Sequence, residues 1–293
     1  MSLPLLVMTV LARSFVFLPG IGPVRETMLW RRGVESWGAY RKLARVPGVR
    51  PHIKARHDAV LEVAEQAFPR DPSFFARVLP PAEHWRAYAS FAAGAAYLDI
   101  ETTGDRTNAV TIVGVRHKGK SRAFVRVAGP LARKARDETW VFGNSHVEGK
   151  DYTPAAVTEF VRDATALVTF NGATFDVPVL EGEGVRFPRV PHVDLRTVFT
   201  RVGLAGGLKK IEEALGLARD DGVKGLSGYD AVKLWRRYEA RGDEEALRTL
   251  VAYNVADFEN LEPLAGYACS TLETRMLQDA RGAQRILPVA TTS

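Results

Sequence analysis

The spacing of apolar residues divides the chain into a helical first third, a strand-rich middle and a helical end. Residues 14–92 contain VRETMLWRRG and HDAVLEVAEQAF, whose apolar positions recur at helical intervals. Four prolines between residues 69 and 81 interrupt the elements that follow. From residue 93 the short β-branched and aromatic runs AAYLDIE, AVTIVGVRH and SRAFVRVAG predict three strands of a meander. The pattern therefore predicts an all-helical module over 14–92, with a domain boundary near residue 92.

Beyond the meander, helices and strands alternate before the chain becomes helical. TPAAVTEFVRDA predicts a helix with Thr153 as N-cap and Pro154 in its first position, and ALVTF and PHVDL predict strands. The segment PLARKARDETWVFGNSHVEGKDY has no clear periodicity and is predicted to be a long exposed connection. After Gly207 the pattern is mostly helical to about residue 278. This order is typical of a mixed α/β domain over 93–278, followed by a tail over 279–293.

Charge is distributed unevenly between the two parts. The 293 residues carry a formal net charge of +6. Residues 1–92 hold 13 Lys and Arg against 7 Asp and Glu, whereas residues 93–293 hold 27 of each. A basic module beside a neutral domain suggests that the module binds a polyanion such as nucleic acid. The alternative is that so small an excess only aids solubility.

Composition and the first residues bear on the compartment. Hydrophobic residues make up 46% of the chain and charged residues 25%, as in ordinary globular proteins. The single cysteine, Cys269, excludes an internal disulfide and a cysteine-based zinc cluster. The apolar start MSLPLLVMTVLA has no basic residue before Arg13 and is too short to span a membrane. We therefore expect a cytoplasmic protein without membrane contact, in which Met8 is a possible start.

Two carboxylates stand at the end of the first predicted strand, in YLDIETTG. Strand alternation puts Asp99 and Glu101 on the same face, where two like charges repel each other and burial increases the cost. A bound cation relieves both problems, and oxygen ligands suit Mg²⁺ or Mn²⁺ better than Zn²⁺. The alternative is a strand end that faces solvent with two ordinary acids.

Two further stretches place acids in apolar surroundings. In VTFNGATFDVPVL, Asp176 follows an apolar strand and a polar turn, so it needs a partner. In AYNVADFENL, Tyr253 and Asp257 are spaced i, i+4 and share one face of a long helix whose apolar residues indicate that it packs on the domain. An aspartate on such a helix can meet the pair at the strand end.

The motifs DIE, NGATFD and YNVAD resemble, in order and context, the three motifs of the DEDD exonucleases, which are ribonuclease-H-like nucleases. A tyrosine four residues before the last aspartate is the mark of the DEDDy type, and no histidine follows His192. The stretch from about residue 93 to 276, with GGLKKIEEALG and GYDAVKLWRRY, is similar to the bacterial YprB-like branch of that superfamily. The resemblance implies a ribonuclease-H-like mixed sheet flanked by helices.

The resemblance also implies a role for each of these side chains. Asp99 would bridge two divalent cations, Mg²⁺ or Mn²⁺, and Glu101 and Asp257 would complete the site of the cation that holds the attacking water. Asp176 would serve the second cation. Such a pair stabilises the entering and leaving oxygens of an in-line phosphoryl displacement. Tyr253 would orient the water or take its proton, and because a free tyrosine has a pKa of about 10, acting as a base would need a cation beside it.

Three neighbouring polar residues receive other interpretations. Asn171 is expected to fix the turn of its motif or to contact nucleic acid rather than to bind metal. Asp194 follows a predicted strand and precedes a helix, which favours N-capping over a fifth catalytic acid. His192 is expected to be a structural histidine rather than a ligand.

The segment FLPGIGPVRETMLWRRGVESWGAYRKL, residues 17–43, resembles a helix-hairpin-helix motif. Gly20 and Gly22 permit a tight hairpin whose backbone N–H groups can face a phosphate, and the next helix is expected to begin near Pro23. Arg25, Arg31 and Arg32 would add phosphate contacts that ignore base identity. The alternative is that the hairpin serves only in packing.

Together with the resemblance, these patterns predict a metal-dependent 3′→5′ exonuclease that hydrolyses phosphodiester bonds of DNA or RNA with a single-stranded 3′ end. A basic helical module is expected to help to hold the nucleic acid. One alternative is an endonuclease that uses the same acids, since the motifs do not set the cleavage mode. The other is a non-catalytic nucleic-acid-binding adaptor with a nuclease-like fold.

Overall fold

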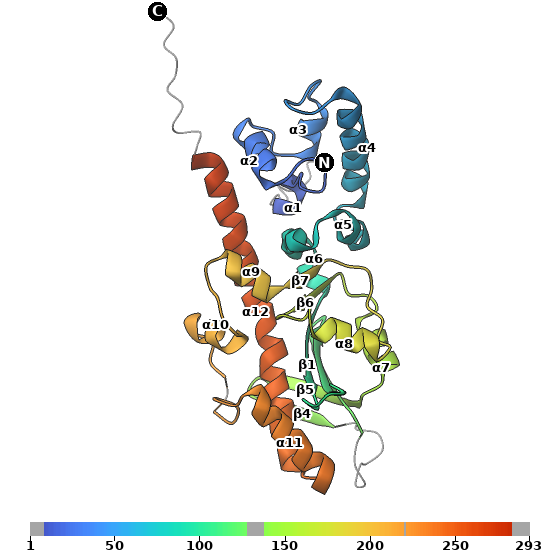
Figure 1. The fold of residues 1–293 in the computed structure, drawn as a ribbon, viewed down its shortest axis with the longest axis vertical. Coiled ribbons are helices and arrows are strands. Elements are labelled where there is room, and N and C mark those ends of the chain that lie inside the picture. The colour runs from blue at the N-terminus through green and yellow to red at the C-terminus, as the bar shows by residue number, and fades with distance from the viewer. Residues whose placement is uncertain (1–8, 128–137, 220, 283–293) are drawn as a thin grey trace, which may run out of the picture.

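The structure of the protein is a computed structural model that describes residues 9–127, 138–219 and 221–282 (Figure 1). Its centre is a seven-stranded sheet with the strand order β4-β5-β3-β2-β1-β6-β7. The strands are β1 (Ala95–Thr102), β2 (Val110–His117), β3 (Lys120–Val125), β4 (Thr139–Phe142), β5 (Ser145–Asp151), β6 (Ala166–Thr169) and β7 (His192–Asp194).

Helices precede the sheet and cover both of its faces. Those before the sheet are α1 (Val10–Arg13), α2 (Pro23–Arg31), α3 (Trp37–Arg41), α4 (Pro51–Ala67), α5 (Pro72–Val78), η1 (Pro81–Ala87), α6 (Tyr88–Phe91) and η2 (Ala92–Gly94). Those after its first strands are α7 (Pro154–Val161), α8 (Asp176–Gly182), α9 (Leu195–Arg201), α10 (Leu208–Ala214), α11 (Gly228–Arg241) and α12 (Glu244–Gly282). Of the expected tail over 279–293, residues 283–293 lie outside the described residues, as do residues 1–8 of the apolar start with Met8.

The predicted meander is confirmed, because β1, β2 and β3 pair antiparallel in sequence order. On the other side of β1, β6 and then β7 pair in parallel, so these three strands end at the same edge of the sheet. Thr153 caps α7 by accepting a hydrogen bond from the amide of Ala156, and Pro154 is the first helical residue, as expected. A mixed sheet flanked by helices, with a helical region before it, is the predicted fold class.

The two faces of the sheet carry separate hydrophobic cores. Leu98 and Ile100 of β1 belong to the core that includes residues of α7 and α8. Tyr97, on the alternate face, belongs to the larger core that includes residues of α12. Because side chains alternate along a strand, Asp99 and Glu101 lie on the face of Tyr97, which is the face that α12 covers. The predicted placement of both acids on one face is confirmed.

One prediction was wrong: residues 139–151 form a hairpin, not an exposed connection. β4 pairs antiparallel with β5, and β5 extends the sheet by pairing in parallel with β3. Trp140 and Val147 are buried, and a Cβ at Gly149 would lie 2.6 Å from the Trp140 ring. Charged residues alternate with the few apolar ones here and hide the strand pattern, but the Gly143-Asn144 link is a recognisable hairpin signal. Residues 130–137 of the expected connection lie outside the described residues.

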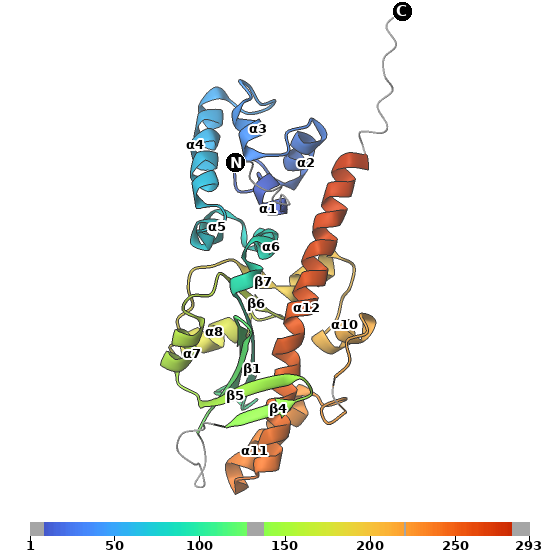
Figure 2. The same cartoon turned by 180° about the vertical axis from the view of Figure 1, so that it is seen from behind.

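The N-terminal helices lie beyond the end of the sheet at which β1 begins, and α12 runs beside both parts (Figures 1 and 2). Their apolar side chains belong to the same hydrophobic core as those of α12. The amide of Val10 donates a hydrogen bond of 2.7 Å to Glu273, and the Arg31 guanidinium lies 3.4 Å from the carbonyl of Asp279. The helical region is thus fixed against the last third of α12.

A largely buried group of polar and charged side chains, here called the N-terminal ion cluster, links these helices to α9. It consists of Ser14, Glu26, Glu83, Arg86 and Arg201. The side chains of Glu26 and Arg86 are both 0% exposed, and their nearest charged atoms lie 2.8 Å apart. Arg86 also pairs with Glu83 at 2.5 Å and donates to the Ser14 hydroxyl at 3.0 Å.

Among the described helices, none combines the length and apolarity needed to cross a bilayer.

Candidate active site

Three carboxylates from two distant parts of the chain meet between β1 and α12. Asp99 and Glu101 come from the last residues of β1, and Asp257 comes from the middle of α12. One ligand oxygen from each lies within 4.8 Å of the others. The prediction that an aspartate on this helix meets the strand-end pair is confirmed as geometry. These three residues and Asp176 are called the acidic cluster below.

The fourth member of the cluster reaches it from α8. Asp176 is the first residue of α8, is 5% exposed, and accepts a hydrogen bond of 3.2 Å from the amide of Ile100. That amide lies between the two acids of β1, so Asp176 sits directly beside them. Within the described residues, Asp176 is not part of the group of three whose oxygens lie within 4.8 Å.

Burial and mutual repulsion make the four acids hard to ionise together. Burial, and then the neighbouring carboxylates, raise the pKa of Asp99 and of Glu101 well above the ordinary range. Burial raises the pKa of Asp176 to about 7 and that of Asp257 to about 6, although Arg219 opposes the shift at Asp257. Buried carboxylates that supply only oxygen ligands are the donor set of a hard divalent cation. The residues present therefore fit a metal site, and a bound cation would remove the cost that raises each pKa.

α12 can pack closely against β1 and β2 because β2 has a glycine, without a side chain, where α12 crosses it. Gly114 pairs with Asp99 across the ladder, and a Cβ there would lie 2.1 Å from Asn254 Oδ1 and 2.2 Å from the Phe258 ring. Asn254 is fully buried and donates a hydrogen bond of 2.9 Å from Nδ2 to the Asp99 carboxylate. Sequence reasoning missed both residues. The signal for Asn254 was available, since a polar residue on the buried face of α12 needs a partner.

Tyr253 lies on α12 one turn before Asp257 and is 6% exposed. Burial, followed by the charges of Asp257 and Glu101, raises the pKa of its phenol. Two cations lie against its ring: Lys209 Nζ is 4.5 Å and the Arg219 guanidinium carbon 5.8 Å from the ring centre. In this state the phenol keeps its proton and acts as a hydrogen-bond donor.

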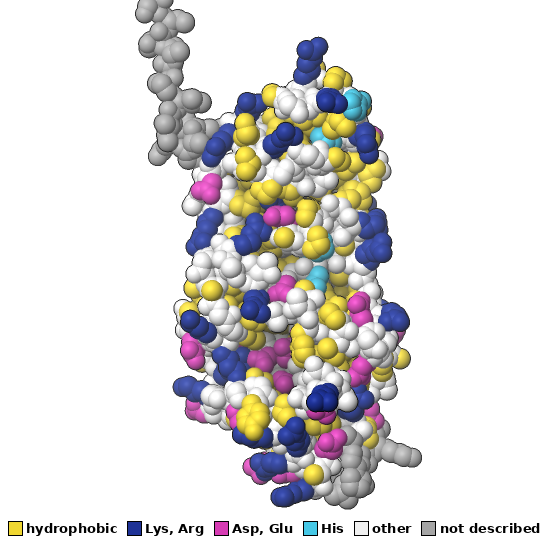
Figure 3. Space-filling model, viewed as in Figure 1, with side chains coloured by type: hydrophobic (Ala, Val, Ile, Leu, Met, Phe, Trp, Pro, Cys, Tyr) yellow, Lys and Arg dark blue, Asp and Glu magenta, His cyan; other side chains and the backbone are white. Residues whose placement is uncertain are grey.

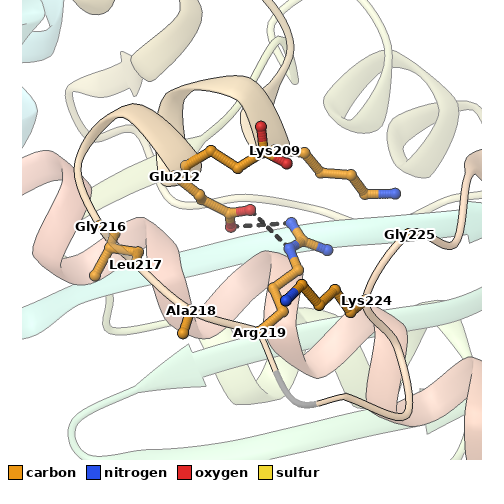
Figure 4. Close-up of a pocket in the computed structure, with 9 residues that line it drawn as sticks. Lys209, Glu212, Gly216, Leu217, Ala218, Arg219, Lys224 and Gly225 are labelled. Atoms are coloured by element: carbon orange, nitrogen blue, oxygen red, sulfur yellow. Dashed lines mark hydrogen bonds and ion pairs between the residues drawn. The ribbon is translucent and has the colours of Figure 1, made fainter.

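Arg219, on the connection between α10 and α11, is a third residue that sequence reasoning missed. Its guanidinium pairs with the Asp257 carboxylate and with Glu212 of α10. Figure 4 shows the double contact with Glu212. No motif announces this residue, because it lies 38 positions from Asp257 in a segment without regular structure. Only the fold brings the two together.

Two of the neighbouring polar residues, Asp194 and His192, have structural partners, as the sequence indicated. Asp194 caps α9 by accepting from the amide of Arg196 at 3.1 Å, and it also accepts from the amides of Asn171 and Ala173. His192 Nε2 lies 2.8 Å from the Thr169 hydroxyl, and burial lowers the pKa of this imidazole to about 4.

Asn171 fixes the turn that leads to Asp176. Its backbone has a φ of 65°, in the left-handed region that asparagine tolerates. Its Oδ1 accepts a hydrogen bond of 2.7 Å from Arg196. The expectation that Asn171 fixes the turn is therefore confirmed, and its contact with nucleic acid stays a prediction.

The residues of the predicted hairpin lie apart from the acidic cluster. α2 begins at Pro23 directly after Gly22, and Gly20 has a φ of 77°. Arg25 donates a hydrogen bond of 2.8 Å to the carbonyl of Gly20. These residues, with Arg31 and Arg32, lie beyond the end of the sheet at which β1 begins, whereas the acids lie near the end at which β1 finishes (Figures 1 and 2).

The surface view shows acidic side chains gathered in a hollow in its lower half, bordered by Lys and Arg side chains (Figure 3). Residues 96–269 match the family model of the RNase H superfamily. This match covers more than half of the chain and contains all four acids and Tyr253. None of the curated proteins matches the chain.

Proposed function

Because the chain belongs to the RNase H superfamily, a nuclease superfamily that implies a nucleic acid substrate, we propose that it is a metal-dependent 3′→5′ exonuclease of the DEDDy type. The observation that carries the proposal is the meeting of three carboxylates from β1 and α12, with ligand oxygens within 4.8 Å of one another, and the buried Asp176 of α8 beside them. A folded core gains nothing from such a group unless a cation neutralises it.

The proposed site holds two divalent cations, Mg²⁺ or Mn²⁺, on Asp99, Glu101, Asp257 and Asp176. When bound, these cations activate a water and stabilise the charge of the phosphoryl transition state. Asp99 is held for this task by Asn254, and Asp176 by the amide of Ile100. Tyr253, whose raised pKa keeps it protonated, donates a hydrogen bond that orients the attacking water or a phosphate oxygen.

The exonuclease mode and its 3′→5′ direction rest on the motif resemblance. The N-terminal region, residues 14–92, is proposed as a nucleic-acid-holding module of helix-hairpin-helix type, with Gly20, Gly22 and the three nearby arginines as phosphate contacts. Asn171 is proposed to contact the strand near the cluster. Residues 93–278 are the proposed catalytic domain. The part of the nucleic acid strand that contacts residues 14–92 is then distant from the 3′ end that is cleaved.

The test is digestion of end-labelled single- and double-stranded DNA and RNA with Mn²⁺, with the Asp99→Asn protein as matched control. We expect mononucleotides to be released from the 3′ end by the wild-type protein only. A ladder of internal fragments would replace the exonuclease proposal with an endonuclease. Absence of cleavage of all four substrates would remove the nuclease proposal.

A further inference from the structure

The Arg219 guanidinium pairs with two carboxylates at once, those of Glu212 and Asp257. Its Nε and Nη2 atoms donate to the two oxygens of Glu212 at 2.6 Å and 2.9 Å, and Nη2 also donates to Asp257. Glu212 is 1% exposed and accepts a further hydrogen bond of 2.9 Å from Asn260. Glu212 is therefore a fixed anchor, while Asp257 belongs to the acidic cluster.

The contact with Asp257 puts a positive charge where the cluster needs a cation. Arg219 and a divalent cation compete for the same carboxylate, because both are drawn to it by charge. A cation that takes Asp257 leaves the guanidinium with Glu212 alone. Its charge is then available to another anion.

The remaining nitrogen of the guanidinium indicates where that anion lies. The Arg219 side chain is 7% exposed, and among the described residues nothing accepts a hydrogen bond from its Nη1. A buried donor without a partner is costly, so it marks a place for an acceptor. Arg219 lines a cavity of about 350 Å³ together with Lys209, Lys224, two glutamates at 212 and 213, and small and apolar residues over 216–218 (Figure 4). That volume lies within the range of sites for small ligands.

We propose that Arg219 changes partners during the cycle of this enzyme: it neutralises Asp257 in the metal-free protein, and it binds a phosphate of the substrate strand in this cavity once a metal has taken Asp257. The inference rests on the proposed function, because that function supplies both the metal and the phosphate. Arginine suits the role, since its planar fork can keep Glu212 on one edge and offer another edge to a phosphate.

The exchange couples the two ligands. Metal binding frees Arg219 for nucleic acid, and a phosphate on Arg219 keeps it from returning to Asp257. By thermodynamic reciprocity, each ligand then raises the affinity for the other by the same factor. Arg219 is thus a positioning residue for Asp257 and a binding residue for the strand.

The experiment measures Mn²⁺ affinity by electron paramagnetic resonance, with and without a single-stranded oligonucleotide that has non-cleavable linkages, in wild-type and Arg219→Gln proteins. Without the oligonucleotide, we expect Arg219→Gln to bind Mn²⁺ about 3- to 10-fold more tightly, because the competing charge is gone. With Mn²⁺ saturating, it should bind the oligonucleotide about 10-fold more weakly. A purely structural role for Arg219 would weaken both. Unchanged or weaker Mn²⁺ binding in a folded Arg219→Gln protein would overturn the proposal.

Two further variants complete the test. Arg219→Lys keeps the charge but not the fork, so Mn²⁺ affinity should stay within about twofold of wild type while oligonucleotide affinity falls. This arm decides the matter if Arg219→Gln fails to fold, and a change in Mn²⁺ affinity beyond that range would overturn the proposal. Lys210→Gln, an exposed neighbour outside the cavity lining, is the control and should change neither affinity. The Mn²⁺ measurement without nucleic acid needs no cleavage, so its failure is distinguishable from failure of the nuclease proposal.

Discussion

Two groups of charged side chains lie largely inside the protein, and they differ in how the charges are balanced. In the N-terminal ion cluster, Glu26 accepts a hydrogen bond of 2.6 Å from the amide of Phe15 and pairs with Arg86. The two acids of that cluster face two arginines, Arg86 and Arg201. In the acidic cluster, four carboxylates are opposed by Lys209 and by Arg219, which already shares its charge with Glu212.

The difference distinguishes a structural ion pair from a ligand site. Burial disfavours the charged form of the acids in both groups, since it is the largest cause of the raised pKa of Glu26 and of the raised pKa of Asp99. Arg86 opposes the shift at Glu26, whereas the next largest causes at Asp99 are the like charges of Asp257 and Asp176. The N-terminal ion cluster is balanced by its own arginines and stabilises the fold. The acidic cluster has too few positive charges of its own, which favours binding of a cation.

The largest effect is expected from Asp99→Asn, which removes one negative charge from the acidic cluster. Cleavage should fall below detection, because a proposed metal ligand is lost. The melting temperature of the metal-free protein should stay equal or rise, since one repulsive charge is gone. Nuclease assays and thermal unfolding in EDTA measure the two outcomes. Wild-type activity in Asp99→Asn would contradict the site assignment.

Tyr253→Phe sharpens the comparison by removing a single hydroxyl from the acidic cluster. The rate should fall by about 10²- to 10⁴-fold, the usual range for a group that donates or accepts a proton. Mn²⁺ affinity and melting temperature should change little, because the ring and its two cations stay in place. An unchanged rate would mean that Tyr253 serves only in packing.

Glu26→Gln tests the balanced cluster, where the opposite signature is expected. It leaves Arg86 as a buried charge with fewer acidic partners, and breaking such a pair costs about 3–5 kcal/mol of unfolding free energy. Denaturant unfolding measures this loss. The rate per folded molecule at a saturating substrate concentration should stay near wild type, because the cluster lies beyond the far end of β1. A stable protein with lost activity would reverse the assignment of the two clusters.

Much of the sheet and the four acids could be predicted, because the information is local. Alternation in YLDIETTG fixes the common face of Asp99 and Glu101, and the i, i+4 spacing fixes that of Tyr253 and Asp257. The N-cap role of Asp194 also follows from its position between a strand and a helix. The DEDDy roles and the helix-hairpin-helix identity stay predictions.

The rest depends on distant parts of the chain meeting. Gly114 matters only because α12 crosses β2 at that point, and the pattern of β2 alone reads as an ordinary strand with one glycine. Arg219 matters only because Glu212 and Asn260 hold the α10–α11 connection over Asp257. The β4–β5 hairpin was missed because its apolar residues are too few to outweigh its charges.

A smaller effect concerns the dependence of stability on pH in the acidic cluster. Folding raises the pKa of Asp257 to about 6 and of Asp176 to about 7, from an ordinary value of about 3.9. The folded state therefore binds protons more tightly than the unfolded state. The stability that these groups contribute is fully present below about pH 4 and is lost as the pH rises through 6 and 7.

In EDTA, we therefore expect the melting temperature to fall between pH 5 and pH 8. Saturating Mn²⁺ should flatten or reverse this slope, because metal binds the deprotonated carboxylates. Asp176→Asn is the matched control and should remove part of the slope, since its amide does not titrate. A melting temperature that rises with pH in EDTA would contradict the description of the cluster as short of positive charge.

The smallest effect is expected at the surface of the N-terminal helices, in the protein with Arg25, Arg31 and Arg32 all changed to Ala. If these arginines neutralise phosphates, affinity for long single strands should fall, and the log–log dependence on salt should become shallower by about 0.7 for each lost contact. Turnover at a saturating concentration of short substrate should stay near wild type, because the acidic cluster lies toward the other end of β1. Point variants in the full chain are needed, since removing the helices would expose the core that they share with α12.

The matched control changes Arg162, Arg189 and Arg236, three exposed arginines elsewhere, to Ala. It lowers the net charge by the same amount, so it isolates position from charge. We expect the control protein to keep the wild-type salt slope, because its arginines lie at the C-cap of α7, before β7 and on α11 rather than at the hairpin. If both triple variants bind long strands equally and with the same slope, the positive charge of the first 92 residues acts without a defined site. The hairpin would then be a packing element. The acidic cluster would be the ligand site, and the N-terminal helices would serve only as structural support.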